Sequence, residues 1–542
     1  MVVVSYVQVA GVAHGASLTR AINNIKNGTK VTTTARPPQQ LIQRRVPSRR
    51  RSDDGGSSFS PVCVMASYGV VESWSPSTRE EVFPLIDIHG NGFPLAPLPK
   101  QNYALTEEVI TMISKRNDEP EWMLQFRLNA LNQWLMMKEP EELLQTSRRI
   151  DFRTVCDFAS RVYQRDDNSS ANSQRVLSSD AGTSDNSDSF ATTHQKALAE
   201  AGVIFCSISE AIQKYPELVR KYLGKVVSSS ENYFAALNSA IFTDGSFCYV
   251  PKNTICPIDI STYFLVEGRK VTNLFERNLI ICEEGSYVSS LGCTSPSPSM
   301  DASQQLNAPV IELYCAEGAE IKYFVVENWQ EPGANRSPVQ SEVYNFVTQR
   351  GLCDGPRSKI TWITVELGST IAWHHPTVVL KGNGSTGQSF SMTMLNSGQF
   401  ADMGARIIHM GSNTKSRVVS KSVHAGNSHG CFRSYVEIHP LAKNARSEVT
   451  WDAMLLGPHA EAVSYPSSTV RNTSAQIKQE GSASGVNEHT VFYFQQRGIE
   501  FQKAVQTILT GFCSDILREL PCEFEEEVKV MVELKIEEST RS

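Results

Sequence analysis

The sequence predicts a mainly β protein with helical segments at both ends of a β core. Short runs of β-branched and aromatic residues recur between residues 235 and 495, among them "IKYFVVENW", "KITWITVEL" and "TVFYFQQ". Gly, Asn, Ser or Asp separates the runs, as expected for strands joined by turns. Many short strands without intervening helices indicate a β-solenoid, a sandwich or a barrel, and the irregular spacing leaves all three open.

The beginning of the chain has the composition of an organelle-targeting segment. Residues 1–52 contain nine Lys or Arg and no Asp or Glu, although the whole chain has a net charge of −6. Basic, Ser/Thr-rich and acid-free stretches are typical of transit peptides, and "SPVCVMAS" suits cleavage near residues 63–66. We therefore expect residues 1–65 to be a chloroplast transit peptide, with a disordered arm for nucleic acid as the alternative. The acidic remainder argues against nucleic acid as the main partner.

Helical patterns on either side of a polar linker precede the core. In the N-terminal helical region, residues 66–164, Thr106 is the expected N-cap of a first helix. A second helix has an apolar stripe made of Trp122, Phe126, Ala130 and Trp134. Ser, Asp and Asn dominate residues 165–190, which we expect to be a disordered linker. Another helical segment is expected at residues 191–234.

The chain ends in a predicted helical region, residues 496–542. Its apolar stripe comprises Val505, Ile508, Leu509, Phe512 and Ile516. Such a stripe packs against its own domain or against a partner, and the pattern does not decide between them. No run approaches the roughly 18 apolar residues that span a bilayer, so we expect no membrane segment.

Two glycine motifs are better explained as turns than as ligand sites. "GNGSTG" (382–387) matches a dinucleotide fingerprint, and "GNSHG" (426–430) matches a nucleophile elbow. Both motifs require a following helix, whereas strand-like runs follow here. The sequence also has no G-x-x-x-x-G-K-[ST] loop, so we expect the chain itself not to hydrolyse ATP.

Thiols and imidazoles are the candidate metal ligands. Twelve cysteines without a C-x-x-C pair suit a reducing compartment rather than a disulfide framework. His424, His429 and Cys431 lie within eight residues, and imidazole with thiolate suits zinc or iron. The adjacent His374 and His375 are expected to point to opposite sides of a strand. Ordinary strand and loop positions are the favoured interpretation of all five residues.

Cys293 is the cysteine with the most unusual surroundings. It follows the strand-like "YVSSL" and a glycine, where the backbone is expected to leave the strand for a turn. A thiol displayed at a turn is available for chemistry, whereas a buried one is an inert packing residue. Both interpretations are open from the residues alone.

Long phrases in fixed order resemble SufB, the scaffold subunit of the SufB/SufD family in iron–sulfur cluster assembly, here of the plastid type. They include "NYFAALNSAIFTDGSFCYVPKNT", "LGCTSP", "GAEIKYFVVENW", "YNFVTQRGLC" and "FYFQQRGI", and the resemblance extends from about residue 100 to 535, except for the Ser/Asp-rich linker. It implies a right-handed parallel β-helix core flanked by N- and C-terminal helices. It also implies a chloroplast stroma protein that works with SufD and with the ABC-type ATPase SufC, which docks on the C-terminal region.

The resemblance assigns roles to individual residues. "GCTSP" resembles the family's "GCTAP", so Cys293 would accept persulfide sulfur from a SufE-type carrier and a cysteine desulfurase. The family's ligand cysteine in "CDSML" is replaced by Trp451, which cannot ligate iron. Where the family has "EHE", Glu480 is the remaining candidate metal ligand, and Asn427 replaces a histidine.

These departures leave two functional hypotheses. The first is a scaffold that transiently carries an iron–sulfur cluster. The second is a SufB-like paralogue that has lost cluster assembly and has a regulatory or structural role. Whether a reduced flavin joins the complex is left open by the resemblance.

Overall fold

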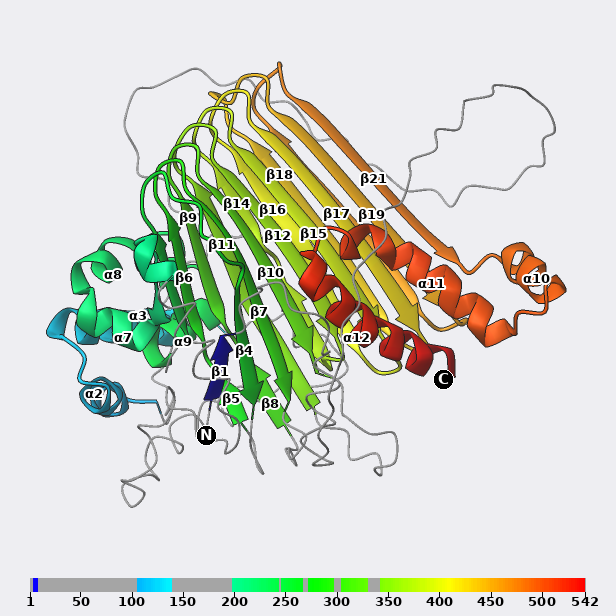
Figure 1. Ribbon diagram of the computed structural model, residues 1–542, viewed down its shortest axis with the longest axis horizontal. Helices are drawn as coiled ribbons and strands as arrows, with labels where there is room; N and C mark the ends of the chain where they lie inside the picture. Colours follow the sequence, from blue (N-terminus) through cyan, green and yellow to red (C-terminus); the bar gives the residue numbers. More distant parts are fainter. Residues whose placement is uncertain are drawn as a thin grey trace, which may run out of the picture. The chain divides into compact units, whose positions relative to one another are not determined.

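Two sheets of mainly parallel strands form the centre of the protein (Figure 1). The computed structural model describes residues 3–7, 105–138, 197–242, 245–266, 272–296, 304–329 and 342–541. The strands wind into a β-solenoid of about seven turns, with helices before and after it. The structure thus selects the solenoid from the three mainly β architectures that the sequence left open. The predicted linker and nearly all of the predicted transit peptide lie outside the described residues.

The chain alternates between the two sheets, which are called sheet A and sheet B, as it winds through the solenoid. Sheet A has the order β1 (Val3–Val7), β4 (Ile260–Val266), β7 (Tyr287–Pro296), β10 (Glu320–Asn328), β12 (Lys359–Leu367), β15 (Thr386–Leu395), β17 (Lys415–Ala425), β19 (Arg446–Leu456) and β21 (Gln476–Gly485). Sheet B has the order β2 (Ile204–Ser207), β3 (Ser246–Val250), β6 (Arg277–Cys282), β9 (Val310–Cys315), β11 (Glu342–Cys353), β13 (Ile371–His374), β16 (Phe400–His409), β18 (His429–Ile438) and β20 (Glu461–Val470). The short strands β5 (Thr272–Leu274), β8 (Gln304–Asn307) and β14 (Thr377–Leu380) pair alongside them.

Parallel pairing keeps equivalent positions of successive coils in register. Only β1 with β4 and β2 with β3 pair in antiparallel fashion among the described strands. In sheet A, Lys359 pairs with Thr386, 27 residues later, whereas Glu320 pairs with Lys359, 39 residues later. The coils therefore differ in length, which explains why the sequence shows no clear repeat.

The solenoid interior and its outer faces follow the alternation of each strand. In β10, Ile321, Tyr323 and Val325 belong to the interior cluster, whereas Phe324 and Val326 belong to a cluster outside sheet A. Because successive side chains of a strand point to opposite faces, each strand contributes to both clusters.

Helices cover the outer face of sheet B at the first coils. They are α2 (Glu107–Arg116), α3 (Glu121–Met136), α7 (Ile208–Lys214), α8 (Pro216–Tyr222) and α9 (Tyr233–Ile241). Thr106 is the N-cap residue of α2, as predicted. Trp134 of α3 and Phe234 of α9 pack in one cluster with Phe346 of β11. The predicted stripe of α3 is thus a packing face.

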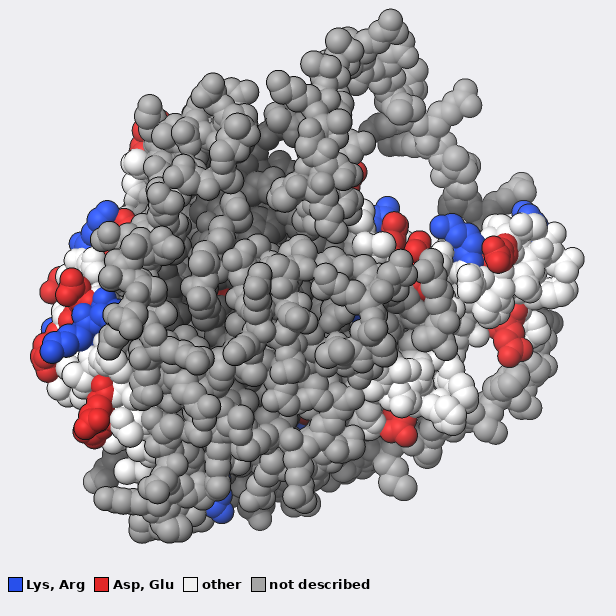
Figure 2. Space-filling view, turned by 90° about the horizontal axis from the view of Figure 1, so that it is seen from below, with Lys and Arg blue, Asp and Glu red and all other residues white. Residues whose placement is uncertain are grey.

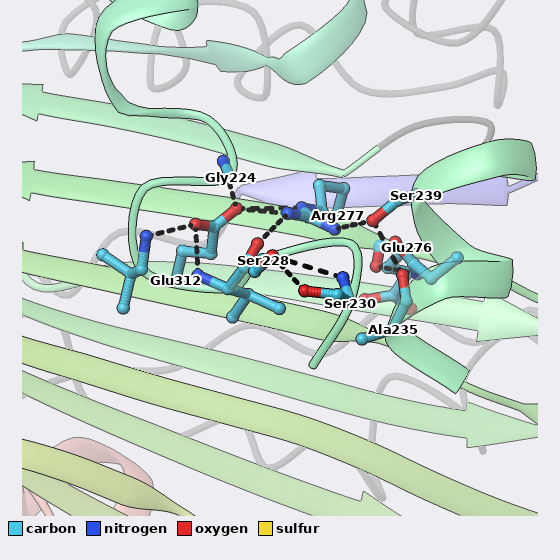
Figure 3. Close-up of polar contacts among 11 residues, drawn as sticks. Gly224, Ser228, Ser230, Ala235, Ser239, Glu276, Arg277 and Glu312 are labelled. Atoms are coloured by element: carbon cyan, nitrogen blue, oxygen red, sulfur yellow. Dashed lines mark hydrogen bonds and ion pairs between the residues drawn. The ribbon is translucent and has the colours of Figure 1, made fainter. Parts of the chain in front are cut away.

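A buried ion pair fixes these helices to the solenoid (Figure 3). Arg277 of β6 donates to the Glu312 carboxylate of β9 at 2.5 Å, and both side chains are fully buried. Glu312 also accepts hydrogen bonds from three backbone N–H groups of the α8–α9 loop, those of Gly224, Val226 and Val227. Arg277 in turn donates to the Ser239 hydroxyl of α9. The pair is therefore fully hydrogen-bonded, the condition under which a buried ion pair is tolerated.

Helices also follow the solenoid and pack on the outside of sheet A. They are α10 (Glu488–Gln496), α11 (Phe501–Leu517) and α12 (Cys522–Arg541). The prediction that "TVFYFQQ" is a strand is wrong, because these residues form most of α10. Strand pairing ends with β21, and Asn487 caps the helix by accepting from the His489 N–H. Local β propensity is weak where no neighbouring strand is available.

Charged groups of both signs are interspersed on the described part of the face seen from below (Figure 2). None of the described helices has the length and apolarity required to cross a membrane.

Candidate functional site

Cys293 lies within a strand and not at a turn, so this part of the prediction is wrong. β7 continues to Pro296, and Cys293 pairs in register with Val326 of β10 and with Tyr263 of β4. Pairing on both sides holds the backbone extended past Gly292, which the sequence suggested as the strand end. The side chain is on the outer face of sheet A and is only 3% exposed.

Trp451 and Glu480, the two positions at which the resemblance suggests cluster ligands, are on opposite faces of sheet A. Trp451 of β19 faces the interior, is 7% exposed, and stacks on Phe432 of β18 with ring centroids 6.2 Å apart. Glu480 of β21 faces outward, is mostly exposed, and pairs with Lys478 at 2.9 Å. Glu480 is therefore satisfied by a lysine at the surface. A metal held by Glu480 would have no contact with the interior at Trp451.

A group of polar residues inside the solenoid was missed by the sequence analysis. The Asn345 amide of β11 donates to the Glu366 carboxylate of β12 at 2.9 Å and lies 3.0 Å from His374 Nε2. Asn307 of β8 donates to Asn345 and to Glu327 of β10. The signal that could have found them is a charged or amide residue inside an apolar strand run, as in "VVENW". The sequence did not show which of these residues face inward.

Burial controls the protonation of this interior group. Desolvation raises the pKa of Glu327 well above its usual range, and the nearby Glu366 and Glu276 carboxylates raise it further. Both side-chain atoms of Gln305 and of Gln349 are buried without a hydrogen-bond partner. Buried polar groups of this kind are normally satisfied by internal water, so the interior at this level is suited to small polar molecules.

The candidate metal ligands do not come together. His424 faces the interior, His429 pairs with Glu461 at the surface, and the Cys431 thiol donates to Asp402 at 3.5 Å. Burial and the Asp402 carboxylate raise the pKa of Cys431 well above its usual range, which keeps it a thiol. Among the described residues, no group of three or more His, Cys, Asp or Glu is arranged to hold a metal ion.

His374 and His375 point to opposite sides, as expected from their adjacency. His374 lies 3.1 Å from Glu366 in the interior, and His375 lies 2.9 Å from Asp402. Neither histidine can share a ligand sphere with the other.

Three further cysteines form one row in the interior. Cys282, Cys315 and Cys353 pair in register on β6, β9 and β11. Burial raises the pKa of Cys282 and of Cys353 to about 12. Thiols of such high pKa are inert packing groups, so these residues are structural.

The predicted partner-binding stripe is divided between the core and the surface. Val505, Leu509 and Ile516 are buried in the cluster outside sheet A, and Ile508 and Phe512 are partly buried there. Lys421 of β17 also donates to the Phe512 carbonyl and to Asp515, which ties α11 to the sheet. Among the described side chains of this region, the exposed aromatic residues are instead Phe492, Tyr493 and Phe501.

The last coil leaves two strand edges exposed. β20 and β21 are ten residues each and are the final strands of their sheets. The N–H groups of Glu461 and Arg471 donate toward β18, so those of even-numbered β20 residues point outward. Pro466 therefore removes a donor from the middle of this edge, a device that discourages strand addition. In β21, the Gln476 N–H donates inward to Ala445, and no proline interrupts the outward-facing donors.

Fold and site together define a class of protein, a two-sheet, mainly parallel solenoid with helices before and after it and an exposed last coil. Comparison with known proteins places it more closely. Residues 264–512 match the family model "SUF system FeS cluster assembly, SufBD core domain", and residues 175–260 match the SufBD N-terminal region. The chain belongs to the SufBD family of iron–sulfur cluster assembly proteins.

Individual relatives agree with this assignment. The chain is 45% identical over 454 residues to the iron–sulfur cluster assembly SufBD family protein ABCI8, chloroplastic, of Arabidopsis thaliana, covering 80% of each chain. It is 43% identical to the SufBD family protein ycf24 of Pyropia yezoensis, covering 80% of this chain and 91% of the relative. A SufBD family protein of Synechocystis is also 43% identical, with 80% and 93% covered.

Proposed function

We propose that this chain is a scaffold subunit of the plastid SUF iron–sulfur cluster assembly machinery and is not itself an enzyme. The observation that supports the proposal concerns the last coil, formed by β20 and β21, which no further described strand covers. Solenoids need a polar terminal cap to stay soluble, and the described residues provide none beyond β20 and β21. The simplest explanation of the missing cap is that a partner subunit covers the last coil. The family suggests a SufD-type solenoid as this partner.

The two exposed edges differ in what they offer such a partner. β21 has an uninterrupted row of outward donors, whereas β20 lacks one at Pro466. We therefore place the SufD-type contact at β21, where an added strand continues sheet A.

Proline substitution at this edge tests the contact. Ala483→Pro removes an outward-facing donor of β21 without removing a hydrogen bond to β19, and Pro466→Ala on β20 is the matched control. We expect Ala483→Pro to weaken binding of the SufD-type partner at least tenfold and Pro466→Ala to leave it unchanged. Equal binding by wild type and Ala483→Pro, with unchanged circular dichroism, argues against the β21 contact.

Sulfur acceptance is proposed for Cys293. The thiol is buried, so a SufE-type carrier would have to open the strand end next to β4 before the thiolate could react. Incubation with the desulfurase and carrier, followed by alkylation and mass spectrometry, tests this. We expect persulfide on Cys293, none after Cys293→Ser, and none on the fully buried Cys315. Labelling of other cysteines with Cys293 unmodified contradicts the assignment.

Docking of SufC is proposed for the exposed face of α10 and α11, and the ATPase activity is expected in that partner. Ile508 is partly buried and Phe492 is 59% exposed, whereas Leu509 is fully buried in the protein's own core. We expect Ile508→Asp and Phe492→Asp to abolish co-purification of SufC while the variants remain folded. Leu509→Asp is the contrasting variant, because a buried unpaired charge should unfold the region itself.

We propose that the protein is located in the chloroplast stroma after residues 1–65 have been removed. The composition of residues 1–52 and the chloroplastic relative in Arabidopsis thaliana support it. Mass spectrometry of the native N-terminus should find a start near residue 66, and an intact Met1 in the mature protein rejects the proposal.

A second candidate function is that of a SufB-like paralogue with a structural or regulatory role. It is favoured by Trp451, which fills the interior at the family's ligand position, and by Glu480, which is paired with Lys478. Anaerobic loading with iron and sulfide, followed by visible absorption, separates the two candidates. A stable cluster in the wild type supports the scaffold; a cluster retained only after Trp451→Cys supports the paralogue.

A further inference from the structure

The turns that lead from sheet B into sheet A stand side by side along one edge of the solenoid (Figure 1). In the earlier coils, charged residues of neighbouring turns are paired with each other. The pairs are Lys252 with Glu284 at 2.9 Å, Glu317 with Arg357 at 2.8 Å, and Asp354 with Lys381 at 2.7 Å. Exposed pairs of this kind contribute little to stability, but they balance these charges within the chain.

The last coils depart from this pattern. The turns after β16, β18 and β20 read "MGSNT", "HPLAKNA" and "RNTSA" and contain no Asp or Glu. Lys443 and Arg471 lie in these turns, and Lys415 and Arg446 are the first residues of β17 and β19. All four side chains are exposed, and none of them forms an ion pair with a described residue. These four residues are called the basic corner.

Backbone contacts hold the basic corner together. Lys415 and Arg446 are register partners on neighbouring parallel strands. The Asn413 N–H donates to the Lys443 carbonyl at 2.7 Å, and the Arg471 N–H donates to the last carbonyl of β18 at 3.0 Å. Neighbouring strands are about 4.8 Å apart, so the four cations lie on adjacent turns, within reach of one partner surface.

The charges of the basic corner are not relieved within the chain. Like charges opposite each other on neighbouring strands repel, and Lys415 and Arg446 are in this position. Glu448, two residues after Arg446, is already paired with Lys478 at 3.6 Å. Leu441, in the turn before β19, is 70% exposed and adds an apolar contact to this surface. Unpaired cations beside an exposed leucine suit a protein partner that presents carboxylates.

We propose that the basic corner docks an acidic surface of the SufD-type partner. The corner adjoins the edge of sheet A, because Arg446 pairs in register with Gln476, the first residue of β21. The partner's carboxylates would therefore lie beside the edge at which its strand is proposed to add. Opposite charges across an interface raise the association rate and disfavour wrong partners.

The charge of the whole chain narrows the choice of occupant. Its net charge of −6 disfavours nucleic acid, which a basic surface could otherwise attract. The inference rests on the proposed function for the identity of the partner, whereas the charge complementarity is a separate claim.

Charge reversal in the full chain tests the basic corner. Lys443→Glu/Arg471→Glu alters two exposed turn residues, and Lys252→Glu/Lys381→Glu makes the same change in charge on turns of earlier coils. We expect the first variant to bind the SufD-type protein at least tenfold more weakly at roughly 50 mM salt, and with less dependence on salt than the wild type. The control variant should bind within about twofold of the wild type. Surface plasmon resonance measures binding, and thermal denaturation checks that both variants are folded.

Carbodiimide cross-linking identifies the occupant. This reagent joins lysine amines to carboxylates in direct contact, so mass spectrometry should find Lys415 or Lys443 linked to Asp or Glu residues of the SufD-type protein. Links from these lysines to a second copy of this chain, or no links to the partner, overturn the proposal.

The outcomes separate this inference from the proposed function. If Ala483→Pro weakens binding and Lys443→Glu/Arg471→Glu does not, the basic corner has no role and the β21 contact stands. If only the charge reversal weakens binding, the basic corner is supported and the β21 contact falls. Equal salt dependence of the wild type and the charge-reversal variant also overturns the inference. A wild type that does not bind the SufD-type protein removes both.

Discussion

The first coils and the last coil of the solenoid differ in how their polar groups are satisfied. At the first coils, helices cover sheet B, and the buried Glu312 carboxylate accepts hydrogen bonds from Arg277 and from three backbone N–H groups. At the last coil, Glu480 and Lys478 form an exposed pair, and the outward-facing backbone groups of β21 are left to solvent or to a partner. The difference shows that the described polar groups are satisfied within the chain at the first coils and are largely exposed at the last coil.

The largest expected effect comes from breaking the buried pair at the first coils. Glu312→Ala leaves the Arg277 charge and three backbone donors unpaired, so we expect a loss of about 3–5 kcal/mol in the free energy of unfolding. Urea denaturation measures it. The control is Glu284→Ala, which removes an exposed pair with Lys252 and should cost about 0–1 kcal/mol. Similar losses in both variants would remove the contrast between the buried and the exposed pairs.

Tryptophan truncation compares the enclosed interior with the end of the solenoid. Trp362 of β12 is fully buried, whereas Trp451 is 7% exposed and has only β21 beyond it in sheet A. Trp→Ala changes in a core cost about 3–5 kcal/mol, and we expect Trp362→Ala to reach this range. Trp451→Ala should cost less, because solvent at the uncapped end can fill the space. Thermal and urea denaturation measure both losses of stability. Equal losses for Trp362→Ala and Trp451→Ala would mean that solvent enters the last coil no more easily than the middle of the solenoid.

The interior carboxylate of Glu327 is expected to give the stability a pH dependence. The pKa of Glu327 is raised in the folded state, so the folded chain holds this proton more tightly than the unfolded chain does. Its stabilising contribution is therefore present below the unfolded pKa and is lost as the pH rises toward the folded value. We expect Glu327→Gln to match the wild type near pH 4.5 and to be more stable at pH 8, by about 1.4 kcal/mol per unit of pKa shift.

Denaturation midpoints at several pH values measure this effect. Glu320→Gln, which alters a partly exposed pair with Lys359, is the control for removal of a carboxylate near the surface. A Glu327→Gln variant that is less stable than wild type at pH 8 would show that the buried carboxylate is ionised and paired.

The smallest effect is expected at the last coil itself. Glu480 is 59% exposed and paired only with Lys478, so Glu480→Gln should change the free energy of unfolding by less than about 0.5 kcal/mol. Iron retained after anaerobic loading should be unchanged as well. A large loss of iron in this variant would identify Glu480 as a metal ligand and would place an iron site at the last coil.

Much of the architecture was readable from local pattern, whereas the site was not. Helices α2, α3 and α11 follow from their caps and apolar spacing, and most strand runs from β-branched and aromatic clusters. The run "TVFYFQQ" was misassigned because only the end of the sheet at β21 shows that no neighbour remains to pair with it. Cys293 was misplaced for the complementary reason, since pairing with β10 and β4 extends β7 beyond its glycine.

The sequence by itself determined the mainly β core, the helical flanks, the basic composition of residues 1–52 and the absence of an ATP-binding loop, because each depends on residues close together in the chain. The tertiary structure decided which residues face inward, since a strand's two faces look alike until its register is known. It thereby separated Trp451 from Glu480, brought Glu327, Glu366 and His374 together, and buried His424 in the interior. The hydrogen bonds from Asn307 to Glu327 and Asn345, and from Asn345 to Glu366, join residues 20–38 positions apart, and only the winding of the solenoid brings them within reach.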